Sequence, residues 1–293
     1  MSEYYWDQQI EYLQNTRWLY YNDDYLNFLV RDVWKIDSPV NLVDFGCGFG
    51  YLGLKLLPLL PKGSSYTGLE KGTELIQRAR ENFADLPFPT EFIPCDIETI
   101  HMESRYDIAL SHAFLLHMTD SKKILQKMID SVRDQGRVIC FEPHWIANAS
   151  NYALDGVDQS DVMRLGELQK LYELDARRTG KNGNIGMLLP ILFSQLGLKD
   201  VECRVSDRVN FLDQNMDGMK KDELYRSLRD EGLGQTPGDL EETIQHLIQR
   251  GLTPVEAREQ VEAEQRFAEA FSEQSWLTYA PNMKITFGTR YCN

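Results

Sequence analysis

A cluster of glycines between two patterned segments constrains the fold of this chain more than any other feature. The cluster lies within residues 41–71, which read NLVDFGCGFGYLGLKLLPLLPKGSSYTGLEK. An apolar run enters it, a leucine-rich helical pattern leaves it, and a second short strand pattern ends at Glu70. This order of strand, glycine loop, helix, strand and acid is the arrangement that holds a nucleoside. Small residues let the backbone approach the ligand, and the acid accepts hydrogen bonds from ribose hydroxyls.

Strand and helix patterns continue to alternate after this cluster. Helical spacing of apolar residues covers residues 72–83 and 121–132, and strand patterns cover 91–97, 106–111 and 137–141. Alternation at such short spacing predicts a mostly parallel sheet with helices on both faces.

The later part of the chain adds a few more elements. Residues 146–182 are polar and predicted to be helical in part. An apolar helix is predicted at residues 183–196, with Gly197 as its stop. Two further strands are predicted at residues 201–211 and 284–292.

Composition changes along the chain and indicates three parts of a single domain, residues 1–293. Residues 1–37 are helical and rich in aromatic side chains, which predicts an N-terminal helical cap. Residues 38–212 and 280–293 form the predicted core. Residues 213–279 are charged and poor in β-branched residues, so a helical insertion, or lid, is predicted before the last strand.

Two glycine registers overlap in the cluster. Residues 46–50 match GxGxG, and residues 48–53 match GxGxxG, the dinucleotide fingerprint. The first register fits better because Gly46 is the first glycine after the strand. Asp44 also favours it, since an acid is unwelcome near a pyrophosphate and welcome near an ammonium or sulfonium group.

A third acid and a later motif complete the pattern. Asp96 ends the third strand pattern, where its carboxylate can accept from an exocyclic amine while the N–H of Ile97 donates to an adenine ring. With DFGCGFG at residues 44–50, Glu70 and SHAFLLHM at residues 111–118, the chain resembles the class I S-adenosylmethionine-dependent methyltransferases. These motifs occur in the order of that family.

The resemblance implies a Rossmann-like, doubly wound α/β fold. Its sheet has seven strands and is mostly parallel, with an antiparallel last strand. It also implies S-adenosylmethionine as the methyl donor and S-adenosylhomocysteine as the product, and no metal is expected. The residues expected to bind the cofactor are Asp44, Gly46, Cys47, Gly48, Gly50, Glu70, Lys71, Asp96, Ile97, Ser111 and His112.

Each of the three acids also has a purely structural interpretation. Glu70 could be a solvated strand end, and Asp96 could form a turn. Asp44 could cap the helix after the glycines, a role that is compatible with cofactor contact. These alternatives stay open at the level of the sequence.

Two histidines are candidates for a general base. Methyl transfer needs a base only where the acceptor atom holds a proton that must leave. His117 matches the second histidine of the family's run, and His144 follows the fifth strand, at the sheet edge where open α/β folds bind ligands. Either histidine could instead have only a packing role. The residues expected to contact the substrate are Tyr20, Tyr21, His144 and Trp145.

Charge and composition argue against several kinds of partner. The formal net charge of -14 argues against nucleic acid as a partner, because binding to phosphates requires a basic face. No apolar run is long enough for a membrane span, and the N-terminus lacks the basic flank and apolar segment of a secretory signal. A cytoplasmic location is therefore expected, and a homodimer is compatible with the sequence.

The cysteines point to a reducing compartment. The chain has five cysteines and no CxxC pair, which argues against a disulfide frame and against a zinc site. Free, buried thiols are expected at the four positions in or beside strand patterns, Cys47, Cys95, Cys140 and Cys203.

The sequence therefore predicts a methyltransferase that acts on a small molecule by in-line displacement in a capped pocket. The acidic charge and the cap-like helices favour a small acceptor. One rival is a non-catalytic protein that binds S-adenosylmethionine or S-adenosylhomocysteine as a scaffold or sensor. A less favoured rival is an NAD(P)-dependent oxidoreductase.

Calorimetric titration tests the predicted cofactor. We expect S-adenosylmethionine or S-adenosylhomocysteine to bind with micromolar affinity, about -8 kcal/mol. A variant with Glu70→Ala and Asp96→Ala lacks both predicted nucleoside acceptors and should not bind. Binding of NAD instead would show that the GxGxxG register is the functional one. Binding of none of these ligands by the folded chain would favour the non-catalytic interpretation.

Overall fold

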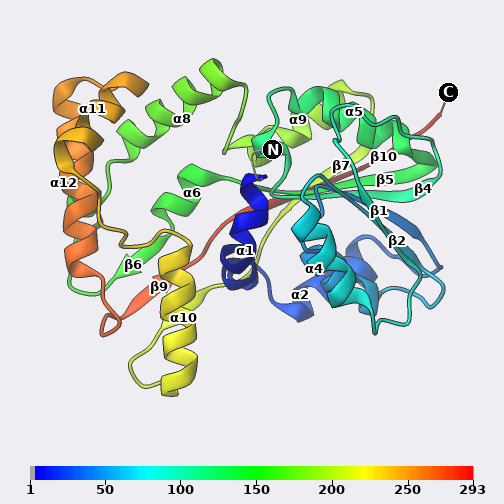
Figure 1. Cartoon of the computed structure of the whole chain (residues 1–293), viewed down its shortest axis with the longest axis horizontal. Helices are drawn as coiled ribbons and strands as arrows, with labels where there is room; N and C mark the ends of the chain where they lie inside the picture. Colours follow the sequence, from blue (N-terminus) through cyan, green and yellow to red (C-terminus); the bar gives the residue numbers. More distant parts are fainter. Residues whose placement is uncertain (1–3, 293) are drawn as a thin grey trace.

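Two sheets anchor two lobes in this protein (Figure 1). The structure, a computed structural model, describes residues 4–292. Within this range the larger lobe is built on a seven-stranded sheet, and the smaller lobe consists mostly of helices with a three-stranded sheet. Helix α1 (Ile10–Thr16) lies between the two lobes.

The larger sheet has the predicted doubly wound form. Its strands are β1 (Asn41–Phe45), β2 (Ser65–Glu70), β3 (Thr90–Pro94), β4 (Tyr106–His112), β5 (Val132–Pro143), β7 (Lys199–Val205) and β10 (Met283–Thr289). They lie in the order β3, β2, β1, β4, β5, β10, β7. The first five pair in parallel, whereas β10 is antiparallel to both of its neighbours, β5 and β7. The predicted mostly parallel sheet with an antiparallel last strand is therefore confirmed.

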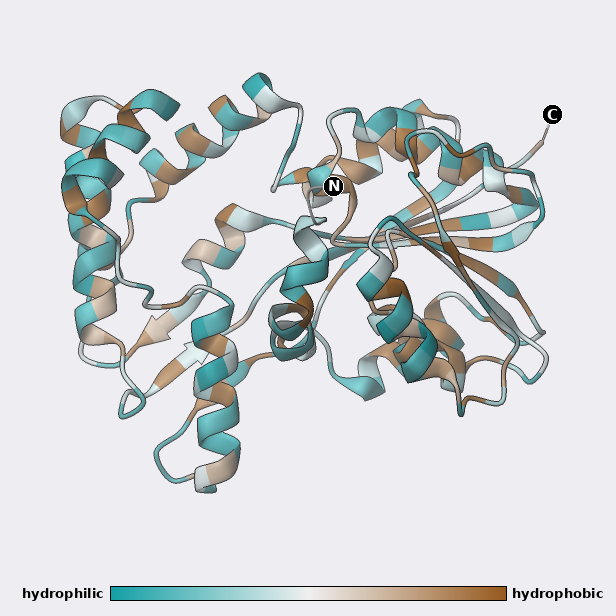
Figure 2. Ribbon diagram, viewed as in Figure 1, coloured by the Kyte–Doolittle hydropathy of each residue, from teal (hydrophilic) through white to brown (hydrophobic). Residues whose placement is uncertain are grey.

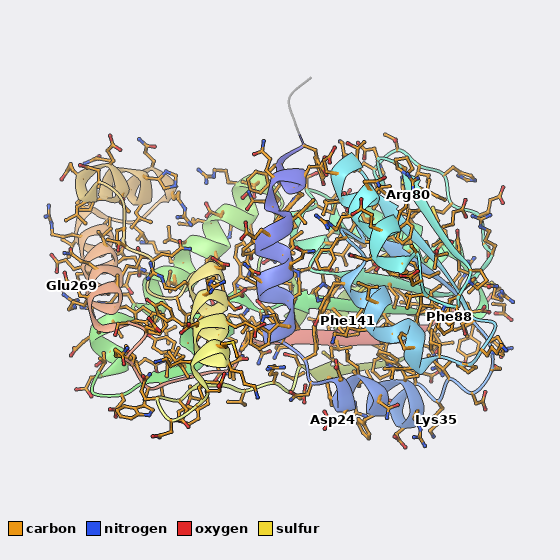
Figure 3. All side chains as sticks on the ribbon, turned by 60° about the horizontal axis from the view of Figure 1, so that its bottom comes forward. Asp24, Lys35, Arg80, Phe88, Phe141 and Glu269 are labelled. Atoms are coloured by element: carbon orange, nitrogen blue, oxygen red, sulfur yellow. The ribbon has the colours of Figure 1, made fainter. Side chains whose placement is uncertain are left out.

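Both faces of this sheet are buried, which explains its nearly continuous apolar strands. Successive residues alternate between the faces: Leu42 and Ile108 pack into one apolar cluster, and Val43 and Ala109 into another. Figure 2 shows hydrophobic strands between helices whose outer faces are polar, and Figure 3 shows Phe141 inside this lobe. The first face is covered by α2 (Asp23–Phe28), η3 (Leu29–Val33), α3 (Tyr51–Leu56) and α4 (Thr73–Phe83), and the second by α5 (Ser121–Ser131) and α9 (Leu189–Gln195).

Short turns of helix connect these elements. They are η1 (Tyr5–Gln9), η2 (Arg17–Leu19), η4 (Leu57–Leu59), η5 (Leu115–His117) and η6 (Ile185–Met187). The N-terminal ones belong to the predicted helical cap. Gly197 has a φ of 89°, a left-handed conformation that favours glycine, and it follows α9 as predicted.

The smaller lobe is assembled from two separate segments of the chain. The first carries α6 (Trp145–Ser150), β6 (Tyr152–Leu154), α7 (Gln159–Val162) and α8 (Leu165–Thr179). The second carries β8 (Asn210–Leu212), α10 (Gly218–Asp230), α11 (Leu240–Arg250), α12 (Pro254–Ala270) and β9 (Leu277–Tyr279). Strand β9 pairs antiparallel with β6 and with β8, which joins the two segments. Figure 3 shows Glu269 of α12 at the far end of this lobe.

Three sequence predictions need correction. The predicted strand at residues 201–211 is two strands in different sheets, because β7 pairs with β10 and β8 pairs with β9. The predicted helical insertion, residues 213–279, also supplies the strand β9, and the segment from α6 to α8 shares its lobe. Cys203 is exposed and not buried, since β7 is the edge strand of the larger sheet.

The predicted burial of the cysteine thiols is confirmed in part. Cys47 and Cys140 are buried free thiols, and Cys95 is half-buried. Among the helices within residues 4–292, none combines the length and the apolar character that a membrane crossing requires.

The buried carboxylate of Glu142 connects β5 to the turn that follows β4. Its Oε1 accepts hydrogen bonds from Ser111 Oγ at 3.0 Å and from the N–H groups of Phe114 and Leu115 at 3.1 and 3.0 Å. Its Oε2 accepts from the N–H of Leu116 at 3.4 Å. Burial raises the pKa of Glu142 to about 7, and these donors oppose the shift. Glu142 therefore has a positioning role.

Replacing Glu142 with alanine should destabilise the chain. The change leaves buried N–H groups of the turn without their acceptor, so we expect the free energy of unfolding to fall by about 3 kcal/mol. Urea denaturation followed by circular dichroism measures this value. Glu103→Ala, at an exposed loop position, is the matched control. A loss no larger than that of the control would contradict the proposed positioning role.

Candidate active site

Two adjoining cavities lie at the carboxyl ends of the parallel strands and between the lobes. The smaller, here called the glycine-loop cavity, has a volume of ≈ 70 Å³ and is lined by residues of the glycine loop, the end of β2 and the N-terminal segment. The larger, here called the interlobe cavity, has a volume of ≈ 590 Å³. Both are lined by Trp6, Arg17, Ala113 and His117, so these four residues mark the junction of the two cavities.

The glycine loop brings backbone to the edge of the smaller cavity. Gly46 has a φ of 70°, and a Cβ there would lie 2.1 Å from the ring of Phe114. Gly48 has a φ of 56°, and nothing lies within 4 Å of the place where its Cβ would be. The first glycine is therefore required by packing, whereas the second leaves open space beside the loop, as close approach of a ligand requires.

Glu70 is held at the wall of the glycine-loop cavity by three backbone donors. Its Oε2 accepts from the N–H of Gly48 at 3.1 Å. Its Oε1 accepts from the N–H groups of Lys71 and Gly72 at 2.7 and 2.9 Å. The residue is only 5% exposed, so it is not a solvated strand end. Burial raises the pKa of Glu70, and the three donors oppose the shift.

Asp44 lines the same cavity and has an unused acceptor. Its Oδ2 accepts from the hydroxyl of Tyr66 at 2.7 Å, while its buried Oδ1 has no partner among the described residues. Burial raises the pKa of Asp44 to about 6, and the hydrogen bond from Tyr66 lowers it in part. The alternative that Asp44 caps the following helix is wrong, because α3 has no side-chain cap. An orphaned buried acceptor is instead suited to a ligand donor.

Five of the predicted cofactor residues lie outside both cavities, namely Gly50, Lys71, Asp96, Ile97 and Ser111. Lys71 Nζ forms an ion pair with Asp96 Oδ2 at 2.8 Å, and Asp96 Oδ1 accepts from the N–H of Glu98 at 2.9 Å. Lys71 is the main cause of the lowered pKa of Asp96. Ile97 is buried in the core of the larger lobe. The turn-forming interpretation of Asp96 therefore describes its observed contacts.

The residues at the end of β4 divide between the core and the cavity. Ser111 is fully buried and donates to the carboxylate below the turn, so it lines neither cavity. His112 lines the glycine-loop cavity together with Cys47, and its Nε2 lies 3.1 Å from the hydroxyl of Tyr21. Burial holds the pKa of His112 well below its usual value. Tyr21 is buried and lines neither cavity, whereas Tyr20 lines the interlobe cavity.

The two candidate bases are placed differently. His117 lies at the junction of the cavities, and its ring centroid lies 4.8 Å from that of Trp6. Burial is the main cause that lowers the pKa of His117 to about 4, so the ring is neutral at physiological pH. His144 lines neither cavity. Trp145 lines the interlobe cavity, with its ring centroid 5.6 Å from that of Tyr172.

Sequence reasoning missed several residues of the site. Trp6 and Arg17 lie in the N-terminal region that is rich in aromatic residues, and no motif or spacing distinguishes these two from their neighbours. Glu231 and Glu264 come from the smaller lobe and line the interlobe cavity. No local pattern distinguishes them from the other acids of residues 213–279, because their neighbours in the cavity are distant in the sequence.

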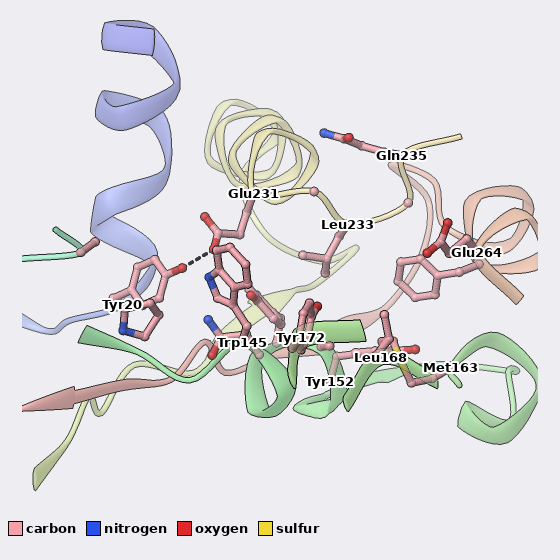
Figure 4. Close-up of a pocket in the computed structure, with 18 of the residues that line it drawn as sticks. Tyr20, Trp145, Tyr152, Met163, Leu168, Tyr172, Glu231, Leu233, Gln235 and Glu264 are labelled. Carbon is pink, nitrogen blue, oxygen red and sulfur yellow. Dashed lines mark hydrogen bonds between the residues drawn. The ribbon is translucent and has the colours of Figure 1, made fainter. Parts of the chain in front are cut away.

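A hydrogen bond between Tyr20 and Glu231 joins the N-terminal segment to the smaller lobe. The hydroxyl of Tyr20 donates to Glu231 Oε1, as Figure 4 shows. Burial raises the pKa of Glu231 to about 7, while Tyr20 and Arg17 lower it in part. This hydrogen bond connects the N-terminal segment to the end of α10, and so it forms part of the wall of the interlobe cavity.

Comparison with known proteins identifies similar chains. A family model described as "Methyltransferase domain" matches residues 36–183. The malonyl-[acyl-carrier protein] O-methyltransferase of Acetivibrio thermocellus is 29% identical over 107 residues, which are 36% of this chain and 37% of that protein. The match therefore spans little more than a third of the length of this curated relative.

Solved structures share the fold at low sequence identity. An S-adenosylmethionine-dependent methyltransferase from Geobacter sulfurreducens, in complex with S-adenosylhomocysteine, is 13% identical with a TM-score of 0.51. The match covers 99% of this chain and 100% of that chain. The [4+2]-cyclase SpnF is 12% identical with a TM-score of 0.53, and 98% of this chain and 94% of that chain are covered. At these identities the similarity shows the fold alone.

Replacing Glu231 with glutamine should reduce the pH dependence of stability. A carboxyl whose folded pKa of about 7 exceeds the ordinary glutamate value of 4.5 stabilises the fold at low pH, and this contribution is lost as pH rises through 7. Glutamine does not titrate, so the fall in unfolding free energy between pH 4.5 and 7 should shrink by about 3 kcal/mol. Urea denaturation across this range measures it. Glu262→Gln, at an exposed position of α12, should behave like the unmodified chain; equal curves for all three proteins would refute the prediction.

Proposed function

This chain belongs to the methyltransferase-domain family, and we propose that it is an S-adenosylmethionine-dependent methyltransferase whose methyl acceptor is a small molecule held in the interlobe cavity. The observation that carries this proposal is the junction of the two cavities at Trp6, Arg17, Ala113 and His117. A methyl group can pass from one cavity to the other only where they meet. The interlobe cavity, ≈ 590 Å³, lies within the range of about 300–1,000 Å³ that is usual for small-molecule sites.

The residues of the glycine-loop cavity fit the cofactor. The free space beside Gly48 admits a ligand against the backbone, and the carboxylate of Glu70 suits ribose hydroxyls. The unpartnered Oδ1 of Asp44 suits an ammonium group. When bound, S-adenosylmethionine supplies an activated methyl group on a sulfonium centre. The protein's contribution is to align the acceptor with that group and to exclude water.

Admission of the cofactor requires a shift of residues 4–17, the first part of the N-terminal segment. The glycine-loop cavity of ≈ 70 Å³ is smaller than small-molecule sites usually are, because Tyr4, Trp6 and Arg17 cover it. Asp7 fastens this segment to α4, since its Oδ1 accepts from the N–H of Leu75 at 3.0 Å. We propose that the segment moves away to admit the cofactor and closes again over it, as a lid that keeps the site dry.

His117 is proposed as the base where the acceptor atom carries a proton. Its imidazole is neutral at physiological pH, so a ring nitrogen can accept the proton that leaves as the acceptor gains the methyl group. Packing against Trp6 fixes the ring at the junction. The hypothesis that His144 is the base has less support, because its side chain lines neither cavity.

The rival interpretations make different predictions for turnover. A scaffold or sensor would bind the cofactor without consuming it, and the [4+2]-cyclase SpnF shares the fold although its name gives another activity. Incubation with methyl-labelled S-adenosylmethionine and a cell extract, separated into metabolites and macromolecules, distinguishes these cases. We expect label in the metabolite fraction. Label in the macromolecules alone would refute a small acceptor, and no label in either would favour the non-catalytic interpretation.

Substitution of His117 tests its role once an acceptor is found. We expect His117→Ala to lower kcat by about 10²- to 10⁴-fold for an acceptor that must lose a proton, with little change in cofactor affinity. Steady-state kinetics with calorimetric titration of S-adenosylhomocysteine measure both quantities. His101→Ala, at an exposed loop position, is the control. A comparable loss with His144→Ala and none with His117→Ala would transfer the role to His144, and unchanged turnover of the double variant would remove the base altogether.

A further inference from the structure

Aromatic rings form much of the wall of the interlobe cavity. Those contributed by the smaller lobe are Trp145, Tyr152, Tyr172, Phe267 and Tyr279. They pack edge to face, with ring centroids 5.6 Å apart for Trp145 and Tyr172 and 5.0 Å apart for Tyr152 and Phe267. The faces of such rings carry negative charge and attract organic cations.

Two carboxylates in this aromatic wall have no cationic partner. Within residues 4–292, neither Glu231 nor Glu264 takes part in an ion pair. Glu231 Oε1 accepts from Tyr20, but the buried Oε2 has no partner among the described residues. In the view of Figure 4 the two carboxylates lie on either side of the rings of Trp145 and Tyr172. When both carboxyl groups are ionised, the cavity therefore holds more negative charge than Arg17 in its lining balances.

Gln260 adds a second orphaned acceptor to this group. It is 2% exposed and lines the cavity, and its Nε2 donates to Glu264 Oε1 at 2.7 Å. An ionised carboxylate only accepts, so this contact directs the amide nitrogen toward Glu264 and the amide oxygen away from it. The buried Oε1 of Gln260 then has no partner among residues 4–292.

These orphaned acceptors indicate the chemistry of a ligand that would complement the cavity. A buried acceptor without a donor costs free energy, and buried charges in proteins are normally paired. Among residues 4–292, the lining offers acceptors from Glu231, Gln260 and Glu264 but only one permanent cation, Arg17, which lies at the junction with the glycine-loop cavity. The complementary ligand is therefore rich in donors and positively charged, with an apolar body that fits the rings.

We propose that the methyl acceptor is a small organic molecule bearing a protonated amine, which is held between Glu231 and the Gln260–Glu264 pair and surrounded by the aromatic rings of the interlobe cavity. This inference rests on the proposed function of that cavity and adds the chemical class of the acceptor. The ammonium group donates to the orphaned oxygens, and the aromatic rings pack against the rest of the molecule. Acids of the same shape are disfavoured, because they would bring a further negative charge to this wall.

Matched probes test the charge preference of the cavity. The purified full chain, saturated with S-adenosylhomocysteine, is titrated with 2-phenylethylammonium, 2-phenylethanol and 3-phenylpropionate. The same titrations are made with the corresponding indole compounds, tryptammonium, tryptophol and indole-3-propionate. We expect each ammonium ion to bind at least about tenfold more tightly than its alcohol, and the carboxylates to bind most weakly.

Two charge-removing variants locate this preference. Glu231→Gln and Glu264→Gln keep an acceptor for Tyr20 and Gln260, respectively, and each should reduce ammonium affinity by about tenfold without changing that of the alcohols. Glu262→Gln, at an exposed position of the same helix as Glu264, should leave every affinity unchanged. Circular dichroism and retained affinity for S-adenosylhomocysteine show that a variant is folded.

The outcomes separate this inference from the function on which it rests. Ammonium preference that is lost in both glutamine variants supports the inference. Equal binding of ammonium ions and alcohols, tighter binding of the carboxylates, or no ammonium binding at millimolar concentration overturns it, provided that S-adenosylhomocysteine binds. Failure of S-adenosylhomocysteine to bind the folded chain overturns the proposed function itself and the inference with it.

Discussion

The burial of the N-terminal segment between the lobes is the interaction on which the site depends. Trp34 packs into the same apolar cluster as the sheet residue Ile139 and the α10 residue Leu228, so one core passes through all three parts. Each fully buried side chain of this size contributes about 1.5–3 kcal/mol. A hydrogen bond of 3.1 Å from Trp18 Nε1 to Ser227 Oγ fixes the orientation of the segment on α10. Because both cavities take part of their walls from this segment, the burial that stabilises the fold also shapes the site.

Several unpaired polar groups lie in the cavities that this arrangement creates. Asp44 Oδ1, Glu231 Oε2 and Gln260 Oε1 are buried acceptors without partners among residues 4–292, and each belongs to a residue that lines one of the two cavities. The raised pKa values of Asp44 and Glu231 reflect the same burial. Glu70 and Glu142, in contrast, are satisfied by backbone donors. These unpaired acceptors lower the stability of the folded chain, and a ligand that donates hydrogen bonds to them would remove this cost. Such a loss of stability is usual at functional sites.

Prediction from the sequence succeeded where a local pattern carried the information. The alternation of strands and helices predicted the parallel sheet, since apolar runs of this length need cover on both faces. Gly46 and Gly48 belong to one strand-to-helix turn, and they line the same cavity as Glu70. Prediction was weaker for Asp96, whose contacts are with Lys71 and Glu98, and for His144, which lines neither cavity. Both residues were predicted from their positions near strand ends, but such a position does not determine where the side chain points.

The sequence by itself determined the class of fold, the place of the glycine loop and the family, because these depend on periodicity and spacing over short stretches of chain. Only the tertiary structure decided which residues meet in the interlobe cavity. Tyr20 and Glu231 are 211 positions apart in the sequence, and their hydrogen bond depends on the packing of the N-terminal segment against α10, where Trp18 also donates to Ser227. Contacts of this kind depend on how separate elements pack, and the local sequence pattern of one element does not indicate which element it packs against.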